Sequence, residues 1–118
     1  MKKSYSEEIR RAEAALFATK DTAIWKEPGR VVASGINGMV AGFSVSIAMI
    51  GLLPTVLYYY ADEKKRRKVL ELIARMSNTT AIDMISNIRV HPDSKAIRQQ
   101  IVDDAIGLKY IIRTYQQE

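Results

Sequence analysis

Val31 to Ala61 read VVASGINGMVAGFSVSIAMIGLLPTVLYYYA, and this uncharged stretch decides the fold. Two interpretations fit it. About 20 apolar residues cross a bilayer as a helix, whereas a helix pair inside a globular bundle is apolar on most faces because most faces are buried. The stretch is too long for one span and too short for two. Since proline suits the first turn of a helix, we expect one helix to end near Gly51 and another to begin near Pro54, and we favour the buried pair.

Cations flank the stretch on both sides, with Arg30 before it and KKRRK at 64–68 after it. In the membrane alternative, residues 39–60 form a single span and the basic run stays on the cytoplasmic side. In the bundle, no helix breaker follows Pro54, so we predict one helix over 54–76. Its later part would face the core through Val69, Leu72, Ile73 and Met76, while the five cations would be solvated.

The N-terminal part of the chain predicts a helix from about Ser6 to Asp21. Ser4 and Glu7 have the spacing of a capping box, in which each side chain satisfies the other residue's free backbone N–H. Pro28 and Gly29 then indicate a turn.

The C-terminal part predicts two further helices. Thr79 or Thr80 can cap a short one, and Asp93 or Ser94 can cap a long last one. The apolar stripe of the last helix is Ile97, Ile101, Ala105, Leu108, Ile112 and Tyr115, with Arg98, Asp104, Lys109 and Arg113 outside it. No alternating strand pattern appears. The sequence therefore predicts an all-α protein, a compact bundle of five or six helices in a single domain over residues 1–118.

Composition limits the classes of function. The chain has 118 residues, a formal net charge of +5 and no cysteine. Without cysteine there are no disulfides, thiolate metal sites or thiol nucleophiles, which suits a reducing compartment. The first residues mix lysine, serine and glutamate and do not resemble a signal peptide, so we expect the cytoplasm. The positive charge favours anionic partners.

Residues that carry chemistry are scarce. His91 is the one histidine, it precedes Pro92 in a loop-like stretch, and we interpret it as a surface residue. Adjacent acidic pairs such as Asp103 and Asp104 point about 100° apart on a helix, so they do not face one scissile bond. The glycine-rich segment 34–42 lacks the Gly-Lys-Ser/Thr ending of a phosphate-binding loop. We therefore predict no enzymatic activity, no metal site and no cofactor.

The basic run at 64–68 is the strongest positive signal. Five consecutive cations repel one another, and a phosphate backbone would relieve that repulsion. A solvated face with acidic neighbours explains the run equally well, so both interpretations stay open. In that interpretation we expect Asp62 and Glu63 to pair with Arg66 and Arg67.

Three segments together resemble a known family. They are RRAEAAL at 10–16, IGLLPTVLYYYA at 50–61 and DDAIGLKYIIRTYQ at 103–116. Their order is similar to that in the Cmr small-subunit family, the small helical protein of type III-B CRISPR effector complexes. The matching positions are Gly51, Leu52, Thr55 and Tyr58 to Tyr60 in the centre, and Ala105, Leu108, Lys109 and Tyr110 in the last helix.

The resemblance implies a non-catalytic subunit that acts in antiviral defence. Members of the family stack in several copies beside the backbone subunits of the complex and line the channel that holds guide RNA and target RNA. They touch the target RNA backbone without reading its sequence. By this resemblance, the expected RNA-binding residues are Lys20, Arg30, Lys64, Lys65, Arg67 and Lys109. Contacts between copies would use apolar surface, for which Tyr58 to Tyr60 and Tyr115 are candidates.

Overall fold

The uncharged central stretch forms two helices joined at a glycine. The computed structural model describes residues 3–118, with α2 over Ile36–Ile50 and α3 over Leu52–Ala61. Gly51 between them has φ 96° and ψ 165°, a backbone conformation that residues with a Cβ rarely adopt. Pro54 lies in the first turn of α3, where its missing N–H is not needed. The predicted helix pair is confirmed.

These helices bury one face each against the rest of the bundle. Ile36, Val40, Phe43 and Ile47 recur at helical spacing in α2 and are at most 1 % exposed. Their outer faces remain apolar and exposed at Val45, Met49, Ile50, Leu57 and Tyr58. Within residues 3–118, no helix combines the length and the apolar character that crossing a bilayer requires.

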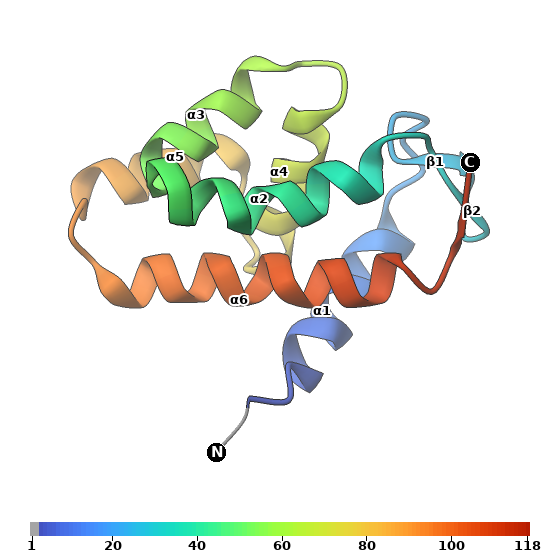
Figure 1. The fold of residues 1–118 in the computed structure, drawn as a ribbon, viewed down its shortest axis with the longest axis horizontal. Coiled ribbons are helices and arrows are strands. Elements are labelled where there is room, and N and C mark those ends of the chain that lie inside the picture. Colours follow the sequence, from blue (N-terminus) through green and yellow to red (C-terminus); the bar gives the residue numbers. More distant parts are fainter. Residues whose placement is uncertain (1–2) are drawn as a thin grey trace.

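Six helices and a small sheet make up the part of the chain from residue 3 to residue 118, and Figure 1 shows their arrangement. The other helices are α1 (Ser6–Ala18), α4 (Arg66–Met76), α5 (Ala81–Val90) and α6 (Lys95–Ile112). The long α6 contacts α1, α2 and α4, and α3 contacts α4 and α5. The predicted all-α bundle of five or six helices is confirmed. Thr80 and Ser94 are the caps of α5 and α6, since their hydroxyls accept from the N–H groups of Asp83 and Ile97.

Two predictions about helix ends are wrong. The expected helix over 54–76 is broken, because the chain leaves α3 after Ala61 and starts α4 at Arg66. The Asp62 carboxylate accepts from the N–H groups of Lys64 and Arg66, both at 3.2 Å, and so holds a turn there. The capping box also does not form: Glu7 pairs with Arg10, and Tyr5 rather than Ser4 precedes α1, which ends at Ala18.

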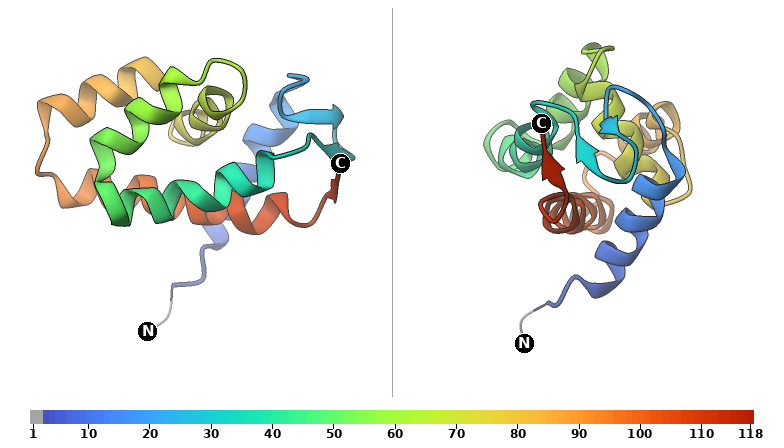
Figure 2. Two further views of the ribbon diagram at one scale, coloured as in Figure 1. Left: turned by 45° about the horizontal axis from the view of Figure 1, so that its top comes forward. Right: turned by 90° about the vertical axis from the view of Figure 1, so that its right-hand side faces the viewer.

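A three-stranded sheet was not predicted. It comprises β1 (Trp25–Glu27), β2 (Val31–Val32) and β3 (Gln116–Gln117), with β2 antiparallel to β1 and parallel to β3. Such short strands show no alternation in sequence. The Trp25 ring, 2 % exposed, packs edge-on against Tyr115 at 5.0 Å and donates to the Leu16 carbonyl oxygen. The sheet therefore closes one end of the bundle, opposite the α5–α6 turn (Figure 2).

A buried polar network joins α1, α4 and α6. Arg11 donates to the Met76 carbonyl oxygen at 2.9 Å and to Asp104 at 2.8 Å. Asp104 also accepts from Ser77 and Gln100 and is 1 % exposed. The prediction that Asp104 lies outside the buried face of α6 is wrong, because α1 packs on that side of the helix and supplies a matching cation.

Candidate nucleic-acid interface

The basic run at 64–68 begins in the α3–α4 turn, and Asp62 sets its conformation. Besides the two backbone N–H groups, Asp62 accepts from the Arg66 guanidinium at 3.2 Å. The Arg66 backbone N–H, followed by those of Lys64 and Lys65, holds the pKa of the Asp62 carboxyl below its ordinary value. Asp62 therefore stays ionised and fixes the direction in which the cations leave the turn.

Most cations of this run are engaged inside the protein. Lys65 donates to the Ser34 carbonyl oxygen at 2.7 Å. Arg67 donates to the Tyr60 carbonyl oxygen at 2.6 Å, lies 3.9 Å from the Tyr60 ring centroid and pairs with Glu63 at 3.8 Å. Lys68 pairs with Asp21 at 3.3 Å. The prediction of a solvated basic run therefore holds for Lys64, which is exposed, while the other four side chains are half-buried.

These contacts bring distant cations to the sheet end of the molecule. Lys65 reaches Ser34, whose N–H donates to Glu118 at 2.8 Å, and Glu118 pairs with Lys26 of β1. The Ser34 N–H, followed by the charge of Lys26, lowers the pKa of the Glu118 carboxyl. A single chain of polar contacts thus runs from the start of α4 to both outer strands of the sheet.

Lys20 and Arg30 lie at the same end. Lys20 lines a shallow hollow of about 190 Å³ with Pro28 and Gly29 of the β1–β2 hairpin, and Arg30 follows in that hairpin. The neighbouring Asp21 receives Lys68 from α4. We call Lys20, Arg30, Lys64 and Lys65 the sheet-end cations.

Three of the sheet-end cations are available for an outside anion. Lys20, Arg30 and Lys64 are exposed, and none pairs with a carboxylate within residues 3–118. Lys65 keeps two free N–H groups besides its bond to Ser34, because an ammonium has three donors. Of the six residues predicted to bind RNA, Lys20, Arg30 and Lys65 therefore lie at one end of the molecule, and Lys64 directly precedes Lys65 in the chain.

The other two predicted residues have different surroundings. Arg67 is held against Tyr60, as described above, and its side chain is 24 % exposed. Lys109 lies on α6 with its ammonium 5.6 Å from the Tyr110 ring, which in turn packs on Tyr5 near the start of α1. No contact among the described residues joins Lys109 to the sheet-end cations.

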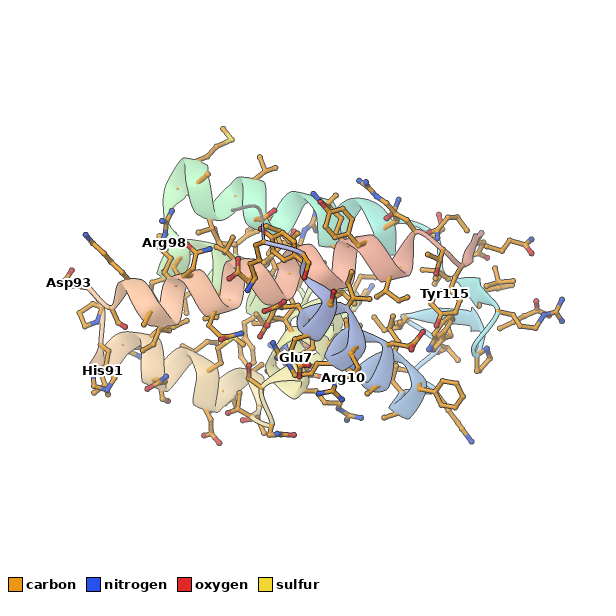
Figure 3. All side chains as sticks on the ribbon, turned by 90° about the horizontal axis from the view of Figure 1, so that it is seen from below. Glu7, Arg10, His91, Asp93, Arg98 and Tyr115 are labelled. Carbon is orange, nitrogen blue, oxygen red and sulfur yellow. The ribbon has the colours of Figure 1, made fainter. Side chains whose placement is uncertain are left out.

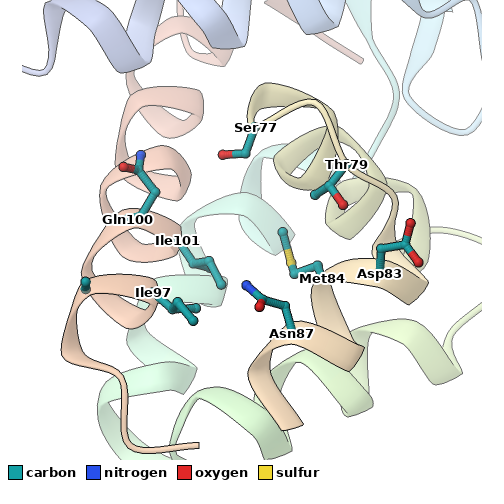
Figure 4. Close-up of a pocket in the computed structure, with 9 residues that line it drawn as sticks. Ser77, Thr79, Asp83, Met84, Asn87, Ile97, Gln100 and Ile101 are labelled. Carbon is teal, nitrogen blue, oxygen red and sulfur yellow. The ribbon is translucent and has the colours of Figure 1, made fainter. Parts of the chain in front are cut away.

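A larger hollow lies between α5 and α6 (Figure 4), and its chemistry differs from that of the sheet end. Its volume is about 400 Å³, with Met84, Ile97 and Ile101 among its apolar lining residues. Its one charged lining residue is Asp83, so it does not suit a phosphate group. Elsewhere in residues 3–118 no cluster of three or more histidine, aspartate or glutamate side chains is arranged as for a metal ion, and His91 is exposed as predicted.

The predicted pairs of Asp62 with Arg66 and of Glu63 with Arg67 are confirmed, and their i to i+4 spacing was the signal. Sequence reasoning missed the distant partners that decide which cations are free. Ser34 engages Lys65 and Glu118 engages Lys26, and both partners are far from these cations in sequence. Comparisons of the chain with known protein families, with curated proteins and with solved structures found no match in any of the three.

Proposed function

We propose that this protein is the non-catalytic small subunit of a type III-B CRISPR RNA-guided effector complex. In this role it contacts the target RNA backbone through the sheet-end cations, without sequence specificity, in cytoplasmic antiviral defence. The observation that carries the proposal is that Lys20, Arg30 and Lys64, from three separate segments, are exposed and have no carboxylate partner among the described residues, while Lys65, next to Lys64, is bonded to Ser34 at the sheet end.

The chemistry of this surface favours backbone contact over base reading. Lysine and arginine neutralise phosphates regardless of sequence. Base reading on single strands needs aromatic rings together with hydrogen bonds to the base edges. At this end Trp25 and Tyr115 are packed against each other, and Phe17, exposed beside Lys20, offers a ring on which a base of any identity can stack. The three segments resemble the Cmr small-subunit family, whose members belong to an RNA-guided effector complex. In such a complex this surface would contact the target RNA.

From the same resemblance we propose protein partners in addition to RNA. Copies of the chain would stack on one another and on the backbone subunits, and both contacts require apolar surface. Tyr58 is 55 % exposed and continues an apolar outer face through Leu57, Met49 and Val45. Tyr59, in contrast, is buried and donates to the Met39 carbonyl oxygen, so it does not take part in such a contact.

Co-purification tests this proposal. We expect the tagged protein, produced from its native chromosomal locus, to co-purify with guide-length RNA and with larger protein subunits from the soluble fraction. Recovery without RNA or partners would contradict the proposal. Recovery only from detergent-extracted membranes would support the alternative in which residues 39–60 form a single span with the basic run on the cytoplasmic side.

A further inference from the structure

A hollow of about 470 Å³ lies at the end of the molecule opposite the sheet, where α3, α5 and α6 meet. Leu52, Leu53 and Pro54 of α3 and Ile88 of α5 line its apolar side. The α5–α6 turn and the first turn of α6 contribute Asp93, Lys95 and Arg98. The hollow therefore combines an apolar floor with a charged rim.

The net charge of this rim is positive, and its cations form no ion pair with a described carboxylate. Lys95 and Arg98 are exposed, and neither pairs with a carboxylate within residues 3–118; the same holds for Arg89 at the end of α5. Asp93 is the one acidic lining residue. Figure 3 shows His91, Asp93 and Arg98 together at this end and Tyr115 at the other.

The first turn of α6 also departs from a general preference. Helix N-termini carry partial positive charge, so acidic residues are favoured there and cations are disfavoured. The first turn of α6 has no acidic residue but begins with Lys95 and includes Arg98. Local rules of this kind are broken most often at functional sites, and a bound anionic group would remove the conflict.

The combination selects the kind of partner. A phosphate backbone gains nothing from contact with an apolar floor. The hollow also has no aromatic ring among its lining residues on which a base could stack. An acidic polypeptide with apolar side chains matches both the floor and the rim. We propose that this hollow docks an acidic amphipathic segment of a partner protein, with an apolar side chain against Leu52, Leu53 and Ile88 and carboxylates facing Lys95 and Arg98. This docking site does not depend on the RNA surface at the sheet end.

A titration of the full-length protein with a synthetic peptide tests the proposal. The probe is acetyl-EELLEELLEE-amide, followed by amide chemical shifts of the labelled protein. We expect shifts centred on residues 52–54, 88 and 95–98. Reversing both rim charges, Lys95→Glu with Arg98→Glu, is expected to weaken binding about tenfold or more, since opposed charge pairs become like-charge pairs. These side chains have no internal carboxylate partner, so the variant retains the interactions that hold the fold.

The controls are a second charge variant, a peptide without leucine and a single-stranded RNA competitor. Arg75→Glu with Arg113→Glu changes the net charge equally and should alter peptide affinity by no more than about twofold. A peptide with serine in place of leucine should lose binding. The proposal is overturned if the peptide does not bind, if the serine peptide binds equally, or if both charge variants weaken binding alike. It is also overturned, in favour of nucleic acid, if single-stranded RNA displaces the peptide and shifts the same amides. The peptide outcomes leave RNA binding at the sheet end unchanged, so the two proposals fail separately, whereas RNA bound in this hollow would count against both.

Discussion

At the scale of single residues, Arg11 and Asp104 hold three helices together. The pair is 2.8 Å apart, and Met76, Ser77 and Gln100 supply further hydrogen bonds. Two more carboxylates, those of Glu8 and Glu7, lie 3.8 and 3.9 Å from the Arg11 guanidinium. A buried charge is tolerated only when it is paired and hydrogen-bonded. The network therefore fixes where α1 and the end of α4 lie on α6, more than it adds net stability.

Replacing Asp104 with asparagine tests this. The Arg11 guanidinium would lose its closest counter-charge and keep the carboxylates of Glu8 and Glu7 at 3.8 and 3.9 Å. The free energy of unfolding should therefore fall, but by less than the cost of about 3 kcal/mol for an unpaired buried charge. Urea denaturation measures the change. Glu7→Gln removes an exposed partner of Arg10 and should leave the midpoint nearly unchanged. An equal effect of the two substitutions would contradict the assigned role of Asp104.

At the scale of elements, two positions control how helices meet. One is the α3–α4 turn at Asp62. The other is Gly107 of α6, where an added Cβ would lie 2.6 Å from the Glu8 Cβ and 2.8 Å from the Glu8 carbonyl carbon. α1 and α6 can approach this closely only because Gly107 has no side chain.

Gly107→Ala is expected to destabilise the protein despite the better helix propensity of alanine. Overpacking costs about 1–3 kcal/mol, more than the gain of about 1 kcal/mol from propensity. Gly38→Ala is the matched control, because nothing lies within 4 Å of the Cβ it would add inside α2. This control should raise stability by about 0.5–1 kcal/mol in thermal or urea unfolding. Stabilisation by both substitutions would rule out the close contact of α1 with α6.

The α3–α4 turn predicts a dependence on pH. The Asp62 carboxyl has a lowered pKa in the folded protein, so its stabilising effect is present above its ordinary value of 3.8 and is lost as the pH falls through the folded-state pKa. Asp62→Asn should therefore destabilise the protein at neutral pH and progressively less below pH 3.8. Chemical denaturation across this range measures the difference. Glu63→Gln removes the neighbouring charge, which is exposed, pairs with Arg67 and accepts from no backbone N–H of the turn, and a similar pH profile for it would refute the role of Asp62.

At the scale of the whole molecule, the sequence was sufficient for features set by local interactions. The caps at Thr80 and Ser94, the division at Gly51 and the apolar stripe of α6 follow from neighbouring residues, and they yield the bundle. The break after Ala61 was missed because no residue in DEKKRRK at 62–68 forbids a helix. The break depends on the Asp62 side chain, which accepts from the backbone N–H groups of Lys64 and Arg66. The sheet was missed because β2 pairs with a strand more than eighty residues away in sequence.

The same division applies to the candidate interface. The sequence shows the basic run, but it does not show which of these cations are free to bind an anion. Ser34 and Asp21 engage Lys65 and Lys68 only after folding. The hairpin packs against the loop after α1 and brings Arg30 to the same end as Lys20, and the bond of Lys65 to Ser34 ties the turn that carries Lys64 to this end. We therefore expect RNA affinity to depend on three residues from three segments rather than on the run of five.

The most direct measurement is the salt dependence of RNA binding by two matched triple variants. One variant is Lys20→Ala, Arg30→Ala and Lys64→Ala at the sheet end, and the other is Arg89→Ala, Lys95→Ala and Arg98→Ala at the opposite end. In fluorescence anisotropy with single-stranded RNA, the first should weaken binding of all sequences alike. It should also reduce the slope of log affinity against log salt by about 2, since each phosphate contact on a single strand contributes about 0.7. The second should leave both quantities close to those of the natural protein. Equal losses in both variants, or binding by the natural protein that does not depend on salt, would contradict the proposed RNA surface.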